Sequence, residues 1–456
     1  MAIIVSNREV TMIDFADDEQ PLLPPPPRSV QDTGLEPAML AELAGKALLG
    51  AGKCHLSVLT SRLRLSINVL REVLDGLQRE QVVEVAWRGD SDIDVQYQLT
   101  GIGRQRAAEW LDRAPYAGPA PVPLDAWRAQ LQRQAVQLPP VLASDVASVF
   151  ADDCLPPRIH ELVGAAMHAG RSLCLYGPSG SGKSVLARRL GTLLQGLVAV
   201  PHALVVGQDI VQVYDPAVHR APLPRQARLP QPTPERRSSD PRWVLCQRPV
   251  VALDGTLDAD LLDVQPDVAS GCHRAPPQLK ANNGLLIVDD LGRQRMPAAE
   301  LLNRFAQAQE LERCALSLAG GYRFQAPCRI RLVFVTNLPP STLLDGAALR
   351  RVGYKIPVGE LSAANYRTLL RQLCLSMGVA YDEAAGRYLL DELHAGSGLP
   401  LLACYPREIV DRVADFAGFM GEPARLSIAT LDQAWISMFA GAEVRAADDE
   451  VEQRIA

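Results

Sequence analysis

Apolar positions in the first quarter of the chain follow a helical period first and a strand period afterwards. Three stretches have the three-to-four-residue spacing of an amphipathic helix: 39–49, 56–63 and 66–80. Ser66 is a suitable N-cap for the third helix. Two stretches that alternate apolar and polar residues, 82–87 and 93–99, then predict a pair of strands with a turn at Gly89 and Asp90. A last helix is predicted over 103–113.

Beyond residue 171 the pattern changes to short apolar runs that alternate with longer helical stretches. The clearest runs of four apolar residues are 173–176, 285–288 and 332–335. This alternation is typical of an α/β domain with a largely parallel sheet. From 359 to 442 the strand-like runs stop and the pattern is helical, with breaks at 396–400 and 421–423. The prediction is an α/β domain followed by a helical domain.

Prolines divide the chain into segments. The sequence has 35 prolines in 456 residues, whereas the usual ~5% would give about 23. They cluster at 21–27, 115–123 and 222–241, where we expect the least order. The boundaries predicted from these clusters are a flexible arm (1–35), a first domain (36–113), a linker (114–137), the α/β domain (138–358), the helical domain (359–442) and a charged tail (443–456).

Composition excludes several classes of protein. Hydrophobic residues make up 48% and charged residues 21% of the chain, which excludes wholesale disorder. No run of about 18 apolar residues is present, so no membrane span is expected, and the N-terminus lacks the pattern of a secretory signal. Nine scattered cysteines contain no Cys-x-x-Cys pair. A reduced, cytoplasmic setting is the expectation.

The strongest chemical signal follows the apolar run 173–176. The next residues are Gly177, Pro178, Ser179, Gly180, Ser181, Gly182, Lys183 and Ser184, and a helical pattern follows over 185–194. This is the G-x-x-x-x-G-K-[ST] loop in its required strand–loop–helix context. Its glycines let successive N–H groups point at a phosphate chain. Lys183 can reach the β- and γ-phosphates of ATP, and the Ser184 hydroxyl can bind Mg²⁺.

Polar side chains also end the other two apolar runs. Asp289 and Asp290 follow 285–288, and Asn337 follows the run at 332–335. We expect Asp289 to hold Mg²⁺, directly or through water, and Asp290 to orient or deprotonate an attacking water. Asn337 can donate to the γ-phosphate or hold that water. The two runs together therefore predict a site for ATP hydrolysis.

These three strands, in this order, resemble those of the AAA+ ATPases over about 144–439. The resemblance implies a Walker A loop at 177–184, a Walker B strand at 285–290 and sensor 1 at Asn337. It further implies an arginine finger at Arg351, or alternatively Arg350, and a sensor 2 arginine at Arg407. A finger acts on the site of a neighbouring subunit, so the resemblance implies a ring, most often a hexamer. Walker B usually ends in Asp-Glu, and the shorter Asp290 predicts slow hydrolysis.

An insertion is expected between the phosphate loop and the apolar run at 285–288. It lies within about 206–280, and its stretch 222–242 holds five arginines against two acids. Residues 316–324 predict a hairpin before the third run. An insertion and a hairpin at these places resemble the AAA+ group that contains MoxR-type and enhancer-binding-activator ATPases. Histidines and cysteines of the insertion have no zinc-finger spacing, so a metal there is disfavoured: His219, Cys246, Cys272 and His273.

The order of helices and strands over 36–113 is similar to that of a winged helix-turn-helix domain. Such domains often bind DNA, and phosphate contacts dominate that affinity. Residues 36–112 carry nine basic and eleven acidic side chains, and the expected wing tip holds Asp90, Asp92 and Asp94. Charge therefore favours a protein-docking role over DNA binding.

The function predicted from the sequence is an ATP-hydrolysing AAA+ protein that remodels or assembles a protein partner. Two alternatives stay open. One is a nucleic-acid-associated ATPase, such as a transposition, replication or transcription helper, with the winged helix on DNA. The other is a switch that binds ATP and hydrolyses it slowly.

Overall fold

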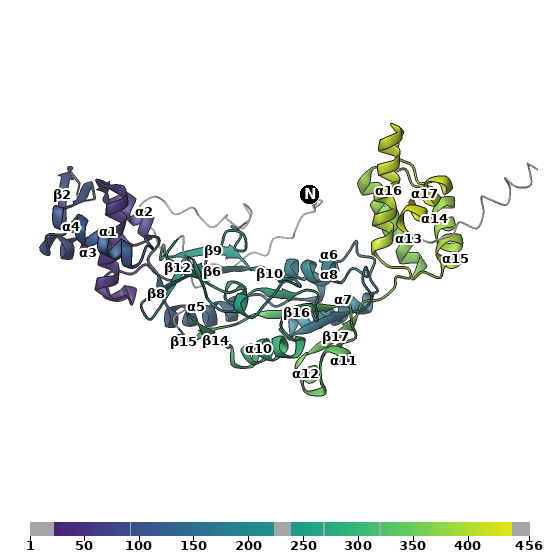
Figure 1. Ribbon diagram of the computed structural model, residues 1–456, viewed down its shortest axis with the longest axis horizontal. Coiled ribbons are helices and arrows are strands. Elements are labelled where there is room, and N and C mark those ends of the chain that lie inside the picture. Colours follow the sequence, from purple (N-terminus) through teal and green to yellow (C-terminus); the bar gives the residue numbers. More distant parts are fainter. Residues whose placement is uncertain (1–21, 92, 223–238, 268–269, 319–320, 440–456) are drawn as a thin grey trace, which may run out of the picture.

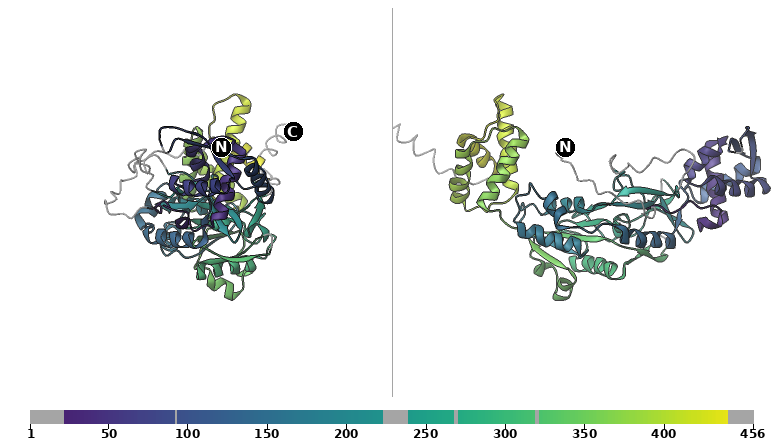
Figure 2. Two further views of the ribbon diagram at one scale, coloured as in Figure 1. Left: turned by 90° about the vertical axis from the view of Figure 1, so that its left-hand side faces the viewer. Right: turned by 180° about the vertical axis from the view of Figure 1, so that it is seen from behind.

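The computed structural model describes residues 22–91, 93–222, 239–267, 270–318 and 321–439. Figures 1 and 2 show three parts in a row, with an N-terminal domain at one end, an α/β domain in the middle and a helical domain at the other end. Within the described residues, no helix is long and apolar enough to cross a membrane. The same residues hold no group of three or more metal-ligating side chains, including in the insertion.

The N-terminal domain has the predicted helices and the predicted hairpin. Its elements are α1 (Pro37–Ala51), β1 (Cys54–His55), α2 (Leu56–Leu63), α3 (Ile67–Arg79), β2 (Val83–Arg88), β3 (Val95–Leu99) and α4 (Gly101–Arg113). The strands form an antiparallel sheet in the order β1-β3-β2. The Ser66 hydroxyl accepts from the Val69 N–H at 3.4 Å, as its predicted N-cap role requires.

Two segments expected to be flexible are folded where the structure describes them. In the arm, Gln31–Thr33 form a short 3-10 helix (η1), and Val30, Thr33 and Leu35 are buried. The expected linker contains β4 (Val122–Pro123) and α5 (Leu124–Gln137). Trp127 and Leu131 of α5 are buried in the core of the α/β domain. Proline density misled the prediction because Pro123 precedes the first helical residue, where a proline does not break a helix.

A five-stranded parallel sheet forms the centre of the α/β domain. Its order is β10 (Val250–Leu253), β13 (Leu285–Val288), β16 (Arg331–Thr336), β5 (Leu173–Tyr176) and β17 (Tyr354–Pro357). One face packs on α10 (Ala298–Leu311) and α12 (Gly346–Arg351). The other packs on α7 (Pro157–His168) and α8 (Lys183–Arg189). Strands covered on both faces are apolar throughout, which explains the apolar runs of the sequence.

Further helices complete this domain. They are α6 (Ala143–Val149), η2 (Leu190–Leu193), η3 (Asp260–Leu262), α9 (Pro277–Lys280) and α11 (Pro340–Leu343). The predicted hairpin is confirmed as β14 (Arg313–Ser317) paired antiparallel with β15 (Arg323–Pro327).

The expected insertion at 206–280 is not a single excursion, because β10 lies inside it and belongs to the central sheet. Three of its other strands join β7 (Ala203–Val206) and β4 in a second sheet, in the order β11 (Gln265–Asp267), β12 (Cys272–Arg274), β8 (Asp209–Gln212), β7 and β4. β6 (Leu197–Pro201) and β9 (Trp243–Gln247) form a separate antiparallel pair. Most of the arginine-rich stretch at 222–242 lies outside the described residues.

The C-terminal part is helical, as predicted. It contains α13 (Ala363–Met377), α14 (Glu383–Tyr388), a π-helical turn η4 (Leu389–His394), α15 (Ala395–Ser397), α16 (Cys404–Met420) and α17 (Ile428–Met438). Residues 1–21 of the expected arm and the expected tail at 443–456 lie outside the described residues.

Candidate functional site

The loop between β5 and α8 has a backbone that requires glycine. Gly177, Gly180 and Gly182 have φ values of 143°, 84° and 90°, which side-chain-bearing residues rarely adopt. A Cβ on Gly177 would also lie 2.2 Å from the carbonyl oxygen of Val358, which follows β17. This strand–glycine loop–helix geometry is the kind that binds phosphate through backbone N–H groups and a helix N-terminus.

Lys183 places its amino group inside this loop. Its Nζ donates to the carbonyl oxygens of Gly177 (2.9 Å) and Pro178 (2.6 Å), and to the Ser181 hydroxyl at 3.3 Å. The residue is only 4% exposed. Burial lowers the pKa of Lys183, and the nearby carboxylates of Asp289 and Asp290 act in the opposite direction. A buried cation held by neutral oxygens is suited to exchange them for phosphate oxygens.

Ser184 and Asp289 provide the oxygen ligands that suit Mg²⁺. The Ser184 hydroxyl, at the start of α8, donates to Asp289 Oδ1 at 3.0 Å, so the loop and the end of β13 meet. The same Oδ1 accepts from the Asp290 N–H at 3.0 Å. A hydroxyl and a carboxylate are hard ligands of the type that Mg²⁺ binds together with nucleotide phosphates. The residues present therefore fit Mg·ATP.

Asp290 and Asn337 lie side by side at the ends of neighbouring strands. Asn337 Nδ2 donates to Asp290 Oδ1 at 3.3 Å. The backbone of Asp290 has a φ of 54°, an uncommon conformation for a residue with a side chain. The next N–H, that of Leu291, donates to the carbonyl oxygen of Val335 at 2.7 Å and ties the turn to β16. The acid and the amide are thus held at the same edge of the sheet as Lys183.

The three predicted arginines have different positions. Arg407 lies in the first turn of α16, and this helix meets the phosphate loop, because the Cys404 N–H donates to the Gly180 carbonyl oxygen at 2.9 Å. The Arg407 side chain itself pairs with Asp411 at 3.7 Å. Arg351, at the end of α12, donates to Asn303 Oδ1 of α10 at 2.6 Å. Within the described residues, neither Arg351 nor Arg350 makes a polar contact with the acids or the loop of its own chain.

Two residues of the site were not predicted. Arg188 lies 4.0 Å from Asp289 and is one helical turn beyond Ser184, a spacing that the sequence does show. Cys404 contacts the loop from the helical domain: a Cβ on Gly180 would lie 2.4 Å from its Sγ. No local signal identifies Cys404, because its partner is more than 200 residues away.

Comparison with known proteins gives one family match and distant structural likenesses. A domain of unknown function (DUF8689) matches residues 362–437, which coincide with α13 to α17. No curated protein matches the chain.

Among solved structures, NtrX from Brucella abortus in complex with ATP is 12% identical. The match covers 66% of this chain and 58% of NtrX, less than two thirds of its length, with a TM-score of 0.39. The RuvB Holliday junction branch migration motor of Thermotoga maritima is 15% identical over 62% of this chain and 67% of RuvB, with a TM-score of 0.34. The α/β P-loop fold of this chain is evident from its own parallel sheet and glycine loop.

Proposed function

We propose that the chain is an AAA+ ATPase that binds Mg·ATP at the carboxyl edge of its parallel sheet and hydrolyses it. The observation that carries the proposal is the cluster at the ends of β5, β13 and β16. There the Ser184 hydroxyl bonds to Asp289, and Asn337 bonds to Asp290, beside the buried Lys183. The order of the sheet supports the AAA+ class, because β16 and β13 lie between the phosphate-loop strand and β10.

Each residue has a role that its position supports. The loop N–H groups and Lys183 bind the phosphate chain, while Ser184 and Asp289 hold Mg²⁺. The bound ion would neutralise charge on the β- and γ-phosphates. Asp290 uses its carboxylate to orient water and accept its proton, and Asn337 fixes that carboxylate through Oδ1. Because Asp is one methylene shorter than Glu, turnover is slow.

The active site is completed between subunits of a ring, most simply a hexamer. Arg351 lies on α12 and donates to Asn303, and among the described residues it has no polar partner in the ATP site of its own chain. An exposed arginine in this position suits a finger that neutralises charge on a neighbour's γ-phosphate. Arg350, on the same helix, is the second choice. Arg407, one turn from the contact between α16 and the loop, senses the nucleotide.

The partner is a protein rather than DNA. In the N-terminal domain, whose order of elements resembles that of a winged helix, α3 would be the helix that reads DNA. Its exposed residues are Ile67, Asn68, Glu72, Asp75 and Arg79. Glu72 already accepts from the Val30 N–H at 2.8 Å, and the wing carries Asp90 and Asp94. This surface has no excess of positive charge for a phosphate backbone. The hairpin β14–β15 supports placement near the MoxR-type group.

Nucleotide binding and turnover of three proteins test the proposal. Wild type should bind Mg·ATP and release phosphate. Lys183→Ala should lose binding, and Asp290→Asn should keep binding while turnover falls about 10²-fold, the usual scale for a general base. Equal turnover of wild type and Asp290→Asn would remove the role of Asp290, and tight binding without turnover would identify a switch. A salt-dependent shift of duplex DNA would favour the nucleic-acid alternative, whereas capture of a protein by the ATP-loaded Asp290→Asn protein would favour remodelling.

A further inference from the structure

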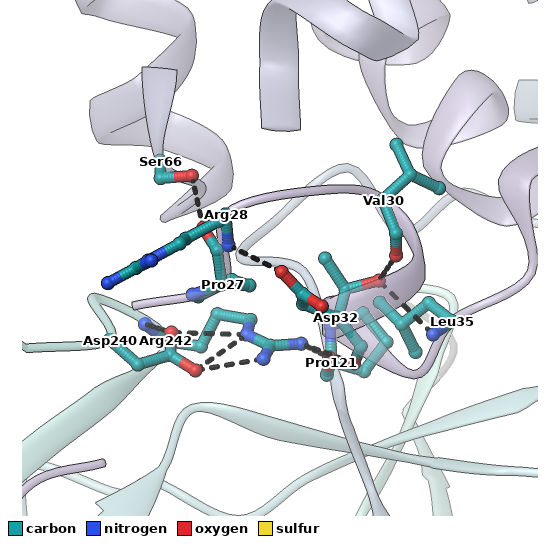
Figure 3. A network of polar contacts seen from close by, with 10 residues as sticks. Pro27, Arg28, Val30, Asp32, Leu35, Ser66, Pro121, Asp240 and Arg242 are labelled. Carbon is teal, nitrogen blue, oxygen red and sulfur yellow. Dashed lines mark hydrogen bonds and ion pairs between the residues drawn. The ribbon is translucent and has the colours of Figure 1, made fainter. Parts of the chain in front are cut away.

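A buried arginine joins the N-terminal domain to the α/β domain. Arg242 and Asp240 are 5% and 3% exposed. In their ion pair, Arg242 Nε donates to both carboxylate oxygens of Asp240, and the terminal nitrogen Nη2 donates to Oδ2 at 2.8 Å. The other terminal nitrogen of Arg242 donates to the carbonyl oxygens of Thr33 (3.0 Å) and Pro121 (3.2 Å). Figure 3 shows this network, in which one guanidinium connects three segments that are distant in the sequence.

The segment before α1 extends this network to both domains. The Asp240 N–H donates to the Pro24 carbonyl oxygen at 2.8 Å. The carbonyl oxygen of Pro27, three residues after Pro24, accepts from the hydroxyl of Ser66, the N-cap of α3, at 2.8 Å. The Val30 N–H donates to Glu72, also on α3. The segment therefore bonds to the N-terminal domain and to the strand region of the α/β domain at the same time.

Apolar packing closes the same junction. Ala203 of β7 and Cys272 of β12 are buried in the core of the N-terminal domain, with Val205 and Ile210 packed against it. The Ala120 N–H also donates to the Leu63 carbonyl oxygen at 2.8 Å. The second sheet of the α/β domain thus shares a hydrophobic core with the first domain.

The chain that leaves Arg242 leads to the ATP site. Arg242 directly precedes β9, and β9 is followed by β10, which lies next to β13 in the central sheet. At the end of β10, the Leu253 carbonyl oxygen accepts from the Asp289 N–H at 2.7 Å. Asp289 is the proposed Mg²⁺ ligand. One short segment, 240–253, therefore connects the buried junction to the acid that would sense the metal and the nucleotide.

We propose that Arg242 is a positioning residue that fixes the N-terminal domain on the ATPase, so that segment 240–253 transmits the nucleotide state of the site to that domain. The coupling part rests on the proposed ATPase function, whereas the rigid junction does not. A guanidinium whose three nitrogens all donate suits this role because it holds three segments in one geometry. The N-terminal domain then moves with the strand beside Asp289 instead of swinging on a linker.

Hydrogen–deuterium exchange of the full chain tests this proposal, with and without Mg·ATP. Arg242→Met alone would leave Asp240 buried and unpaired and could unfold the region, so the informative protein is Asp240→Asn/Arg242→Met. Its matched control is Glu42→Gln/Arg113→Met, which removes an exposed ion pair within the N-terminal domain. We expect the amides of residues 30–35, and those of Ala120 and Val122, to exchange about tenfold faster in the Arg242 double variant, and at an unchanged rate in the control.

The nucleotide arm separates the two proposals. In wild type, Mg·ATP should slow exchange at 177–184 and change the exchange rate at 30–35. In the Arg242 double variant, Mg·ATP should still slow exchange at 177–184 but should no longer affect 30–35. An effect at 177–184 with no response at 30–35 in wild type would overturn the coupling. Unchanged exchange at 30–35, Ala120 and Val122 in the nucleotide-free double variant would overturn the rigid junction. Absence of any effect at 177–184 in wild type would instead contradict the ATPase function.

Discussion

The first glycine of the phosphate loop offers the sharpest test of the site. In Gly177→Ala, the new Cβ would lie 2.2 Å from the Val358 carbonyl oxygen, so the two must separate by about 1 Å to reach an ordinary C···O contact. Val358 cannot yield freely, because its N–H donates to the Tyr176 carbonyl oxygen at 2.8 Å. The φ of 143° is strained for alanine as well.

The size of the effect follows from these two terms. Backbone strain costs about 1–3 kcal/mol, and loss of the bond between Val358 and Tyr176 costs about 1 kcal/mol. The total of about 2–4 kcal/mol falls on the loop that would hold the phosphates. Where the free variant loop relaxes and must regain this conformation to hold the phosphates, the same cost corresponds to about 30- to 1,000-fold weaker binding of Mg·ATP.

Titration calorimetry with Mg·ATP measures this loss directly. The matched control is Gly396→Ala in the helical domain, where an added Cβ meets no atom within 4 Å. We expect the control to bind like wild type and Gly177→Ala to bind at least 30-fold more weakly while circular dichroism confirms that it is folded. Wild-type affinity in a folded Gly177→Ala protein would refute the assignment of this loop as the phosphate site.

Three further predictions concern stability, pH and the finger. Trp127→Ala should lower the free energy of unfolding by about 3–5 kcal/mol in urea titrations, because Trp127 is 1% exposed; Val136→Ala on the same helix, 87% exposed, should have little effect, and equal losses would contradict the packing of α5. Burial, with Arg64 nearby, lowers the pKa of His202 to about 4. The unfolded chain therefore binds a proton between pH 6.5 and 4 that the folded chain does not, and stability should fall as pH drops through this window; urea midpoints of His202→Asn should depend less on pH, and an unchanged dependence would exclude His202. Arg351→Ala should reduce phosphate release of the assembled protein about 10³-fold or more without weakening ATP binding, and Asn303→Ala should reduce it less; full activity of Arg351→Ala would shift the role to Arg350.

Local sequence was sufficient wherever one element carries its own signal. The loop at 177–184 was recognisable because its glycines, Lys183 and Ser184 are consecutive and follow an apolar run. The helices of the N-terminal domain were predicted because their apolar faces repeat every three to four residues. The convergence of Asp290 and Asn337 was also predictable, since the carboxyl ends of parallel strands meet at one edge of a sheet.

Long-range packing decided the rest. The segment 114–137 was predicted to be a linker from its prolines, yet α5 is fixed by partners far along the chain: Gln134 donates to the Ala199 carbonyl oxygen, and Asn283 donates to the Leu131 carbonyl oxygen. Likewise β10 is only four residues long, and its place in the central sheet depends on β13, which begins 35 residues later.

The sequence by itself determined the chemistry that we propose for this protein, because phosphate binding, Mg²⁺ ligation and a general base need particular residue types at fixed spacing. Only the tertiary structure decided how that chemistry connects to the rest of the chain. The contact of Cys404 with the phosphate loop, and the guanidinium of Arg242 between Thr33, Pro121 and Asp240, join residues that no local pattern relates. Burial makes such contacts specific, because a buried polar group must find its partner wherever the chain brings one.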